Sequence, residues 1–556
     1  MPATVFQPIQ VTMLNRAFND QSPAYSVFSN QVAQAVAVGF VEFARAFGAL
    51  YVSLSEDQLS TKLLGNLGVL PNAVLQAALK NYLVEVGKEN VGIVALQLGE
   101  ILSTLENAAG DQAVYKAAAV AWNNEVETSF AYSTDPANTS SVPIGIGPIG
   151  PGGITLSLTS ADDVLSPTAA EAKFKTTAYN DTILAITAGF LSATDLVDGG
   201  GGVDTLKATL AAGATVAPAL QGIERVFITA GVGAGFNAGG NSSLQQVWVD
   251  SAVGAAEFTG VNMATTVGIQ NSSAGGALTV GFTGATGAAD TASLVFADAT
   301  GADEVIVTSI ENLNVNSTAG TVAATKANQV KITADLAETI VITGDQGLST
   351  TVQGAHIASI DASALGKSLN LTMGASSAAT VVVLGGVGAD TFSIAESSGA
   401  RLVLSAGGGE DTIHLNARAA HSVTTGAGAD VVNVTFAAAQ DKALDVSTAE
   451  GPAASAIVVS DFAVGVDVLA VKGTGLGKVA LTGSQFAEVA ASSSLLTAAQ
   501  LAASSAAAKG SIVFRYGADT YVLVNDGTTA NALDAADSLI KLTGVAVLAD
   551  ASWTAA

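Results

Sequence analysis

Three glycine- and aspartate-rich segments in tandem, between residues 384 and 434, constrain the fold of this chain more than any other feature. The first segment, 385–390, matches the pattern Gly-Gly-x-Gly-x-Asp in full, and 406–411 and 425–430 each lack only the first glycine. A short run of β-favouring residues follows each aspartate. The segments begin at residues 385, 406 and 425, so their spacings are 21 and 19 residues.

This spacing predicts a parallel β-solenoid (β-roll) that binds Ca²⁺. Glycines allow sharp turns that aim carbonyl oxygens inward, and the aspartate adds a carboxylate, so the loops offer the hard oxygen ligands that Ca²⁺ prefers. Nonapeptide repeats of this pattern form Ca²⁺-binding parallel β-helices, in which two repeats of about 18 residues complete one coil. The loops should therefore lie on the same side of successive coils, with Ca²⁺ between them. One such loop alone would be typical of an ordinary tight turn.

Further motifs accompany the tandem block. An upstream loop, 198–206, has aspartates on both sides of a glycine run, and 222–226 and 309–315 share an Ile-Glu phrase. Residues 460–469 carry Asp-Phe-x-x-Gly-x-Asp-x-Leu. Together these motifs resemble the RTX class of Ca²⁺-binding proteins secreted by type I (ABC-transporter) systems. Within that class the chain is most similar to the S-layer and S-layer-like surface proteins of Gram-negative bacteria, of the Caulobacter type.

The loops and this resemblance together give a set of predicted Ca²⁺-ligand positions. They are Asp198, Gly200, Gly202, Asp204, Gly385, Gly386, Gly388, Asp390, Gly407, Gly409, Asp411, Gly426, Gly428, Asp430, Asp461 and Asp467. Five more aspartates lie near predicted turns, and we interpret each as a turn residue in preference to an additional ligand: Asp298, Asp303, Asp335, Asp345 and Asp361.

The composition agrees with a protein that needs cations. Lys and Arg number 21 against 47 Asp and Glu, which gives a formal net charge of −26 at pH 7. We expect no binding to nucleic acid, and a chain this acidic repels itself unless cations neutralise it. The absence of cysteine excludes disulfides, zinc–thiolate sites and thiol catalysis. Residues 1–21 lack the basic start and apolar core of a Sec signal peptide.

The patterning predicts a mainly β chain with an α-helical N-terminal domain. We expect four parts: a helical domain at 1–132, a Pro/Gly linker at 133–153, a β-solenoid at 154–450 and a β-rich C-terminal unit at 451–556. Residues 32–52 are apolar on one face at helical spacing, which favours a bundle helix over a membrane span. Ser55 and Gln58 form a predicted capping box. We also expect a short helix within 173–191 and a helix at 487–507.

The resemblance implies several partners. By analogy, the helical domain anchors the protein to cell-surface lipopolysaccharide or another glycan. The last fifty or so residues, which are similar to the ends of serralysin-like substrates, carry the secretion signal that the ABC transporter recognises. The resemblance also implies a homo-oligomeric two-dimensional lattice, with Ca²⁺ as the bound ion and the outer cell surface as the location.

Catalysis is not expected. The chain has three histidines, His356, His414 and His421, and neither a His-Glu-x-x-His nor a Gly-x-Ser-x-Gly motif, so the usual zinc-protease and lipase sites are absent. The leading hypothesis is therefore a secreted, Ca²⁺-dependent S-layer protein. An RTX adhesin or biofilm-matrix protein is the first alternative, and a secreted polysaccharide-active enzyme is the second.

Overall fold

The computed structural model divides the chain into two compact units. The helical unit comprises Met1–Ile154 and Thr177–Asp181, and the β unit comprises Thr155–Thr176 and Thr182–Ala556. The structure describes residues 8–70, 72–108, 110–134, 142–143, 153–251, 254–320, 326–394, 400–417, 420–436, 444–505, 509–527, 529 and 531–556. Most of the predicted linker at 133–153 lies outside the described residues.

The helical unit is a bundle with one continuous hydrophobic core. Its helices are α1 (Ile9–Asn19), α2 (Tyr25–Val38), α3 (Phe40–Ala49), α4 (Glu56–Asn66), α5 (Ala73–Val86), α6 (Val91–Ser103) and α7 (Lys116–Thr134), with 3₁₀ turns at Lys88–Asn90, Thr104–Asn107 and Gly110–Tyr115. Leu14, Phe18, Leu63 and Trp122 are among its buried residues. The capping box at the start of α4 is confirmed. Within the described residues, no helix combines the length and apolarity needed to cross a membrane.

Two details of this unit differ from the expectation. The apolar stretch 32–52 is not one helix, because Gly39 adopts a φ of 86° and separates α2 from α3. The predicted linker also contributes a two-residue strand, β2 (Val142–Pro143), which pairs antiparallel with β1 (Gln21–Ser22). Strands this short leave no periodicity in the sequence.

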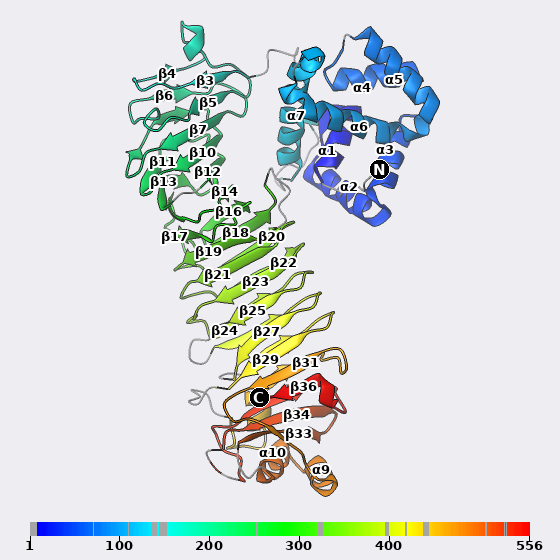
Figure 1. Ribbon diagram of the computed structural model, residues 1–556, viewed down its shortest axis with the longest axis vertical. Helices are drawn as coiled ribbons and strands as arrows, with labels where there is room; N and C mark the ends of the chain where they lie inside the picture. Colours follow the sequence, from blue (N-terminus) through cyan, green and yellow to red (C-terminus); the bar gives the residue numbers. More distant parts are fainter. Residues whose placement is uncertain are drawn as a thin grey trace. The chain divides into compact units, whose positions relative to one another are not determined.

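Most of the β unit is a solenoid-like stack in which strands pair in parallel with strands of the next coil (Figure 1). Sheet 1 contains β3 (Thr155–Ser157), β5 (Thr182–Ala185), β7 (Thr205–Leu210), β10 (Arg225–Ala230), β12 (Gln246–Asp250), β14 (Thr266–Gln270), β16 (Thr291–Ala297), β18 (Asn312–Thr318), β20 (Thr339–Gly344), β22 (Ser359–Leu365), β24 (Thr380–Leu384), β26 (Arg401–Ser405), β28 (Ser422–Thr424) and β30 (Ile457–Val459).

Sheet 2 forms the second wall of the coils, and a short sheet 3 adds a third side to the first coils. Sheet 2 contains β8 (Thr215–Val216), β11 (Ala234–Asn237), β13 (Ala256–Asn262), β15 (Ala277–Thr283), β17 (Asp303–Val307), β19 (Asn328–Ala334), β21 (Leu348–Gln353), β23 (Leu369–Met373), β25 (Thr391–Ile394), β27 (Thr412–Asn416), β29 (Val431–Thr435), β31 (Val468–Lys472) and β36 (Trp553–Ala555). Sheet 3 contains β4 (Val164–Leu165), β6 (Leu196–Asp198) and β9 (Ala219–Gln221).

The predicted coil length is confirmed by the register of sheet 2. Thr391 of β25 lies opposite Thr412 of β27, which lies opposite Val431 of β29, so the spacings of 21 and 19 residues each equal one coil. Burial alternates along strands such as β20, in which Ile340 and Ile342 are fully buried. Stacked β-branched and leucine side chains therefore form the solenoid core.

The predicted helix within 173–191 is wrong. The first coil already begins at β3, and this segment holds only a 3₁₀ turn at Ala172–Phe174 and the strand β5. Burial alternates along β5 in the period-two pattern of a strand. The physical reason is that Ile183 and Ala185 both enter the solenoid core, where they are fully buried.

The C-terminal part closes the end of the solenoid. The strands β33 (Gly510–Tyr516), β34 (Asp519–Asn525) and β35 (Ser538–Leu542) form an antiparallel meander that joins sheet 1 through β30, and β32 (Lys478–Val479) pairs with β33. The predicted C-terminal helix is present as α9 (Gly483–Ala490) and α10 (Leu495–Ser504), and a shorter helix, α8, spans Gly451–Ser455. A separate hydrophobic cluster packs α10 on the meander. This arrangement covers strands that otherwise present an open, aggregation-prone end.

Candidate metal centre

The three tandem loops stack directly on one another. The N–H of Gly408 donates to the carbonyl oxygen of Gly386 at 3.0 Å, and the N–H of Ala427 donates to the carbonyl oxygen of Gly407 at 3.0 Å. The predicted arrangement, with one loop per coil on the same side of successive coils, is therefore present in the structure.

The glycines let the loops approach closely. A Cβ atom at Gly407 would lie 2.1 Å from the carbonyl oxygen of Gly386, and one at Gly426 would lie 1.9 Å from that of Gly407. At Gly428 the distance to the carbonyl oxygen of Gly409 would be only 1.6 Å. Backbone carbonyl oxygens of one loop thus lie against the α-carbons of the next, where a side chain has no room.

The aspartates that end the loops form a ladder, which we define as Asp390, Asp411, Asp430 and Asp467. All four are buried, with exposed fractions of 1, 1, 0 and 2 %. Each carboxylate accepts an N–H from the preceding coil: Leu369 donates to Asp390 at 2.7 Å, Asp390 to Asp411 at 2.8 Å, Asp411 to Asp430 at 2.9 Å and Asp430 to Asp467 at 3.1 Å. The ladder therefore ties successive coils together with charge-assisted hydrogen bonds.

The Asp-Phe phrase supplies the last rung. Asp461 accepts the backbone N–H groups of Thr425 and Gly426, both at 2.8 Å. It therefore holds the third tandem loop from the next coil along the chain. Asp467, six residues later, continues the aspartate ladder although the chain travels 37 residues between rungs 430 and 467. The motif 461–467 is thus a fourth stacked loop with a different sequence.

The two end rungs of the ladder differ from the two middle rungs. The second oxygen of Asp390 accepts the N–H of Gly386 at 3.0 Å, and the second oxygen of Asp467 accepts the N–H of Ala463 at 2.7 Å. Within the described part of the chain, the Oδ2 atoms of Asp411 and Asp430 are buried without a hydrogen-bond partner. For Asp430 the cause is visible, because the N–H of Gly426 donates to Asp461 instead.

The unpartnered carboxylate oxygens of Asp411 and Asp430 fit a cation such as Ca²⁺. An unpaired buried acceptor costs about 1–3 kcal/mol, and more when it is charged, so these oxygens need a proton or a cation. Carboxylate and carbonyl oxygens are the ligand types of Ca²⁺. The predicted ligand positions Gly407, Gly409, Gly426 and Gly428 belong to the same two loops as Asp411 and Asp430.

Burial raises the pKa of Asp390, Asp411 and Asp430, and a bound cation would lower it again. Desolvation raises the pKa of Asp411 to about 7, against the hydrogen bond from Asp390, and the charges of Asp390 and Asp430 raise it further. Burial also raises the pKa of Asp390 and Asp430. Without a cation, ionising Asp390, Asp411 and Asp430 in the folded state therefore costs free energy.

This shift predicts an unusual pH dependence of the metal-free protein. A pKa that is higher in the folded state than in the unfolded state means that folding takes up protons, so stability falls as pH rises from about 4 to about 7. We expect the protein in EGTA to melt at a lower temperature at pH 8 than at pH 5. Scanning calorimetry in about 0.5 M NaCl, which screens exposed charges, measures this, and equal melting temperatures would contradict it.

The upstream predicted loop lies on a separate part of the solenoid. The Oδ1 atom of Asp198 accepts the N–H of Gly200 at 3.0 Å, and Gly200 and Gly202 adopt φ angles of 93° and 110°. Asp204 is buried, and its backbone N–H donates to Glu224 at 2.7 Å. Asp198, Gly200, Gly202 and Asp204 therefore belong to a second ladder-like stack, whose next rung is a glutamate.

The Ile-Glu phrases share one structural role that the sequence analysis did not assign to them. Glu224 accepts the N–H of Asp204, and Glu311 accepts the N–H of Asp290 at 2.9 Å. Both glutamates precede strands of sheet 1 and are each 9 % exposed. The signal was present in the sequence as an acidic residue one coil after an aspartate.

Other buried aspartates form rungs whose oxygens are all satisfied by the protein. Asp163 accepts from the N–H of Thr159 at 2.6 Å, and Asp195 accepts from the N–H groups of Ser192 at 2.7 Å and Asp163 at 3.0 Å. A Ser or Thr residue placed three or four positions before the aspartate supplies the donors. These rungs show that an aspartate in this solenoid does not by itself require an ion.

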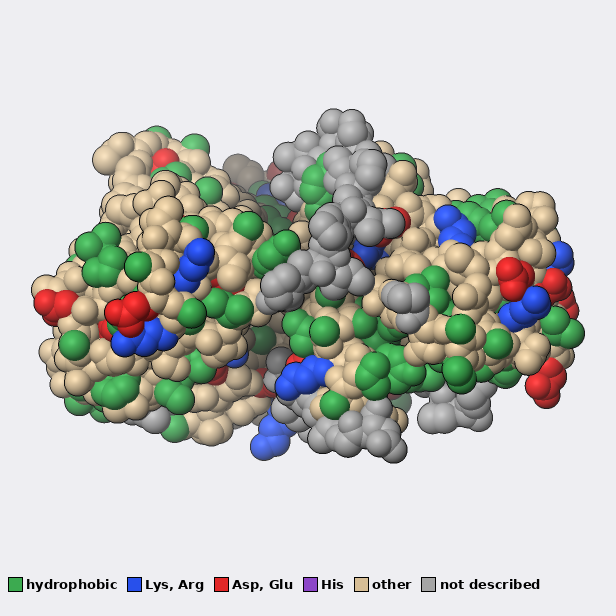
Figure 2. All heavy atoms as spheres, turned by 90° about the horizontal axis from the view of Figure 1, so that it is seen from above, with side chains coloured by type: hydrophobic (Ala, Val, Ile, Leu, Met, Phe, Trp, Pro, Cys, Tyr) green, Lys and Arg blue, Asp and Glu red, His purple; other side chains and the backbone are tan. Residues whose placement is uncertain are grey.

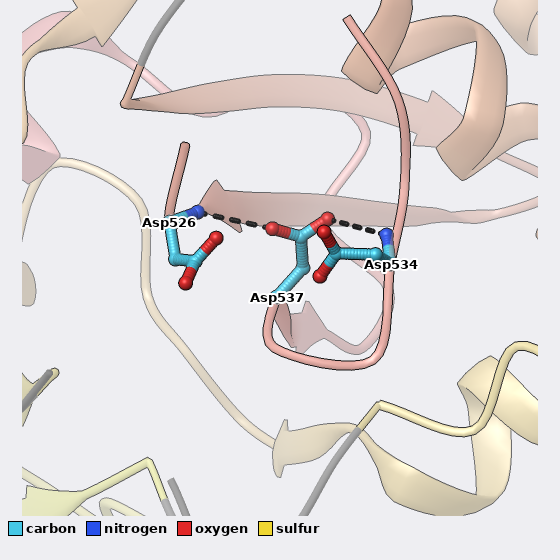
Figure 3. Close-up of side chains that lie close together, drawn as sticks. All are labelled: Asp526, Asp534 and Asp537. Carbon is cyan, nitrogen blue, oxygen red and sulfur yellow. Dashed lines mark hydrogen bonds between the residues drawn. The ribbon is translucent and has the colours of Figure 1, made fainter. Parts of the chain in front are cut away.

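An acidic cluster lies in the C-terminal part, where the sequence analysis predicted no site. Ligand oxygens of Asp526, Asp534 and Asp537 all lie within 4.8 Å of one another (Figure 3). Asp537 is 2 % exposed and uses both oxygens, which accept the N–H groups of Asp526 at 3.0 Å and Asp534 at 2.9 Å. Burial and the two neighbouring charges raise the pKa of Asp537 to about 6. Its hydrogen bonds make this carboxylate the organiser of the turn between β34 and β35.

His421 is buried between adjacent coils of the solenoid. Its Nδ1 atom accepts the N–H of Leu402 at 3.1 Å, and its Nε2 atom lies 3.1 Å from the carbonyl oxygen of Asn416. These contacts give His421 a packing role between adjacent coils.

Comparison with known proteins finds no matching family model and no matching curated protein.

Proposed function

We propose that this chain is a secreted, Ca²⁺-dependent structural protein of the RTX class, which assembles into a surface layer on a Gram-negative cell. The observation that carries the proposal is the pair of buried, unpartnered carboxylate oxygens on Asp411 and Asp430, described above, between stacked glycine loops. Ca²⁺ bound there neutralises the middle of the aspartate ladder and locks neighbouring coils together.

Ca²⁺ dependence makes folding conditional on the compartment. Extracellular Ca²⁺ modules bind with dissociation constants of about 10⁻⁴–10⁻³ M, far above cytosolic free Ca²⁺. The chain therefore leaves the cell unfolded through a type I ABC transporter and folds outside. At free Ca²⁺ ten times the dissociation constant, each site adds about 1.4 kcal/mol to the stability of the folded state.

The helical unit is the proposed anchor to lipopolysaccharide or another surface glycan. Residues 1–132 contain six Lys and Arg against eleven Asp and Glu, so simple charge attraction to a phosphorylated glycan is weak. Among the described residues visible in Figure 2, the blue basic side chains are scattered singly over the surface. Anchoring then depends on hydrogen bonds to sugars or on Ca²⁺ bridges between carboxylates and phosphates.

A Ca²⁺ titration of the purified full chain tests the proposal. The protein is treated with EGTA, CaCl₂ is added back, and circular dichroism and negative-stain electron microscopy are recorded on the same samples. We expect the melting temperature, followed by circular dichroism, to rise and ordered two-dimensional arrays to appear as Ca²⁺ increases. If the protein responds to Ca²⁺ but forms no two-dimensional arrays, the adhesin or matrix-protein hypothesis would replace the surface-layer hypothesis. Turnover of a glycan panel would favour a polysaccharide-active enzyme, and no response to Ca²⁺ would overturn the metal centre itself.

A further inference from the structure

A loop outside the tandem block also contains a buried aspartate with one unpartnered carboxylate oxygen, like the middle rungs of the aspartate ladder. Residues 298–303, Asp-Ala-Thr-Gly-Ala-Asp, connect β16 of sheet 1 to β17 of sheet 2. Asp303 has an exposed fraction of 0 %. Its Oδ1 atom accepts the N–H of Gly276 at 2.9 Å and the hydroxyl of Ser272 at 2.7 Å, both from the preceding coil. Asp303 is therefore a rung of the same kind as Asp411 and Asp430.

The second oxygen of Asp303 is orphaned for the same reason as that of Asp430. The N–H four residues before the aspartate, at Ala299, donates to Asn328 of the next coil at 2.8 Å. Among the described residues, the buried Oδ2 of Asp303 has no hydrogen-bond partner. The same holds for the Oδ2 atom of Asp298, five residues earlier in the same loop.

The neighbouring coils separate this loop from the aspartate ladder. In sheet 2, Asp303 lies opposite Val330 of the next coil. In the coils after that, Asn328 lies opposite Leu348 and Leu348 opposite Leu369, whose N–H donates to Asp390, the first rung of the ladder. Asn328 is neutral, and its amide group donates to protein oxygens of Phe296, Ser317 and Thr318. Burial raises the pKa of Asp303, against the hydrogen bonds from Ser272 and Gly276.

We propose that the loop 298–303 is an additional divalent-cation site, in which Asp303 and Asp298 supply carboxylate oxygens to one Ca²⁺ ion. The loop lacks the Gly-Gly-x-Gly-x-Asp pattern and stands apart from the tandem loops. A cation here supplies the partner that the N–H of Ala299 does not, and it fastens the coil of β16 and β17 as the ladder fastens the later coils.

Ion counting on the full chain tests this site with Ca²⁺ alone as the probe. Equilibrium dialysis against radioactive CaCl₂ at about 10 mM, above the range of extracellular sites, gives the number of ions per chain. We expect Asp303→Asn and Asp298→Asn each to bind one ion fewer than the wild type. Asp195→Asn, which alters a buried rung whose oxygens are satisfied by the protein, serves as the matched control and should keep the full number.

The thermal stability in EGTA separates loss of an ion from damage to the fold. Asp303→Asn removes an uncompensated charge, so we expect its melting temperature in EGTA to equal or exceed that of the wild type. An unchanged ion count in a folded Asp303→Asn variant overturns the proposal. If Asp303→Asn does not fold, an unchanged count in Asp298→Asn overturns it. Loss of ions in an Asp411→Asn/Asp430→Asn variant alone would uphold the tandem centre and reject this site.

Discussion

The double substitution Asp411→Asn/Asp430→Asn should abolish most of the stabilisation that Ca²⁺ gives to the tandem block. Asparagine keeps the oxygen that accepts the N–H of the preceding coil but replaces the orphaned oxygen with an amide that repels a cation. With two sites at ten times their dissociation constants, the lost stabilisation is about 3 kcal/mol. Urea unfolding followed by circular dichroism, with and without Ca²⁺, measures the difference.

The metal-free form provides the internal check. Because the substitutions remove two buried charges that no protein donor compensates, the variant in EGTA should be as stable as the wild type or more stable. Asp163→Asn is the control, since the oxygens of Asp163 have protein partners. It should lower stability equally with and without Ca²⁺. A double variant that keeps the full Ca²⁺ increment would show that the two middle rungs do not bind the ion.

Among single glycine-to-alanine substitutions in the tandem loops, Gly428→Ala should lower the free energy of unfolding most. Gly428 adopts a φ of 152°, and a Cβ atom there would lie 1.6 Å from the carbonyl oxygen of Gly409. Strained φ costs about 1–3 kcal/mol and overpacking about 1–3 kcal/mol, so the free energy of unfolding should fall by about 2–6 kcal/mol. Urea unfolding in saturating Ca²⁺ is the measurement.

Gly408 offers a matched control in the neighbouring loop. A Cβ atom at Gly408 would meet only the carbonyl oxygen of Ala427, at 3.9 Å, which is ordinary van der Waals contact. Gly408→Ala should therefore change stability by no more than about 0.5 kcal/mol. Equal effects of the two substitutions would mean that the loops do not stack as closely as the structure places them.

The sequence predicted the period of the solenoid because the spacing of a repeated motif equals the length of one coil. Loops at 385, 406 and 425 require coils of 21 and 19 residues, and the register of sheet 2 has those lengths. The capping box at Ser55 and the helices within 487–507 were also predictable, since each depends on residues close together in the chain. The helix expected within 173–191 failed because neighbours from other coils, absent from any local pattern, bury alternate side chains of β5.

The candidate site divides in the same way. The sequence by itself determined where the rungs of the ladder lie, because glycine and aspartate at fixed spacing define the turns. Only the tertiary structure decided which rungs lack a partner. Thr159 and Gly386 donate to Asp163 and Asp390 from four residues earlier in the same loop. The corresponding N–H groups of Gly426 and Ala299 instead donate across a coil boundary, to Asp461 and Asn328. Those two contacts join residues 35 and 29 positions apart. The choice of hydrogen-bond partner across a coil boundary depends on register, and register is set by the packing of whole coils, not by the residues of one loop.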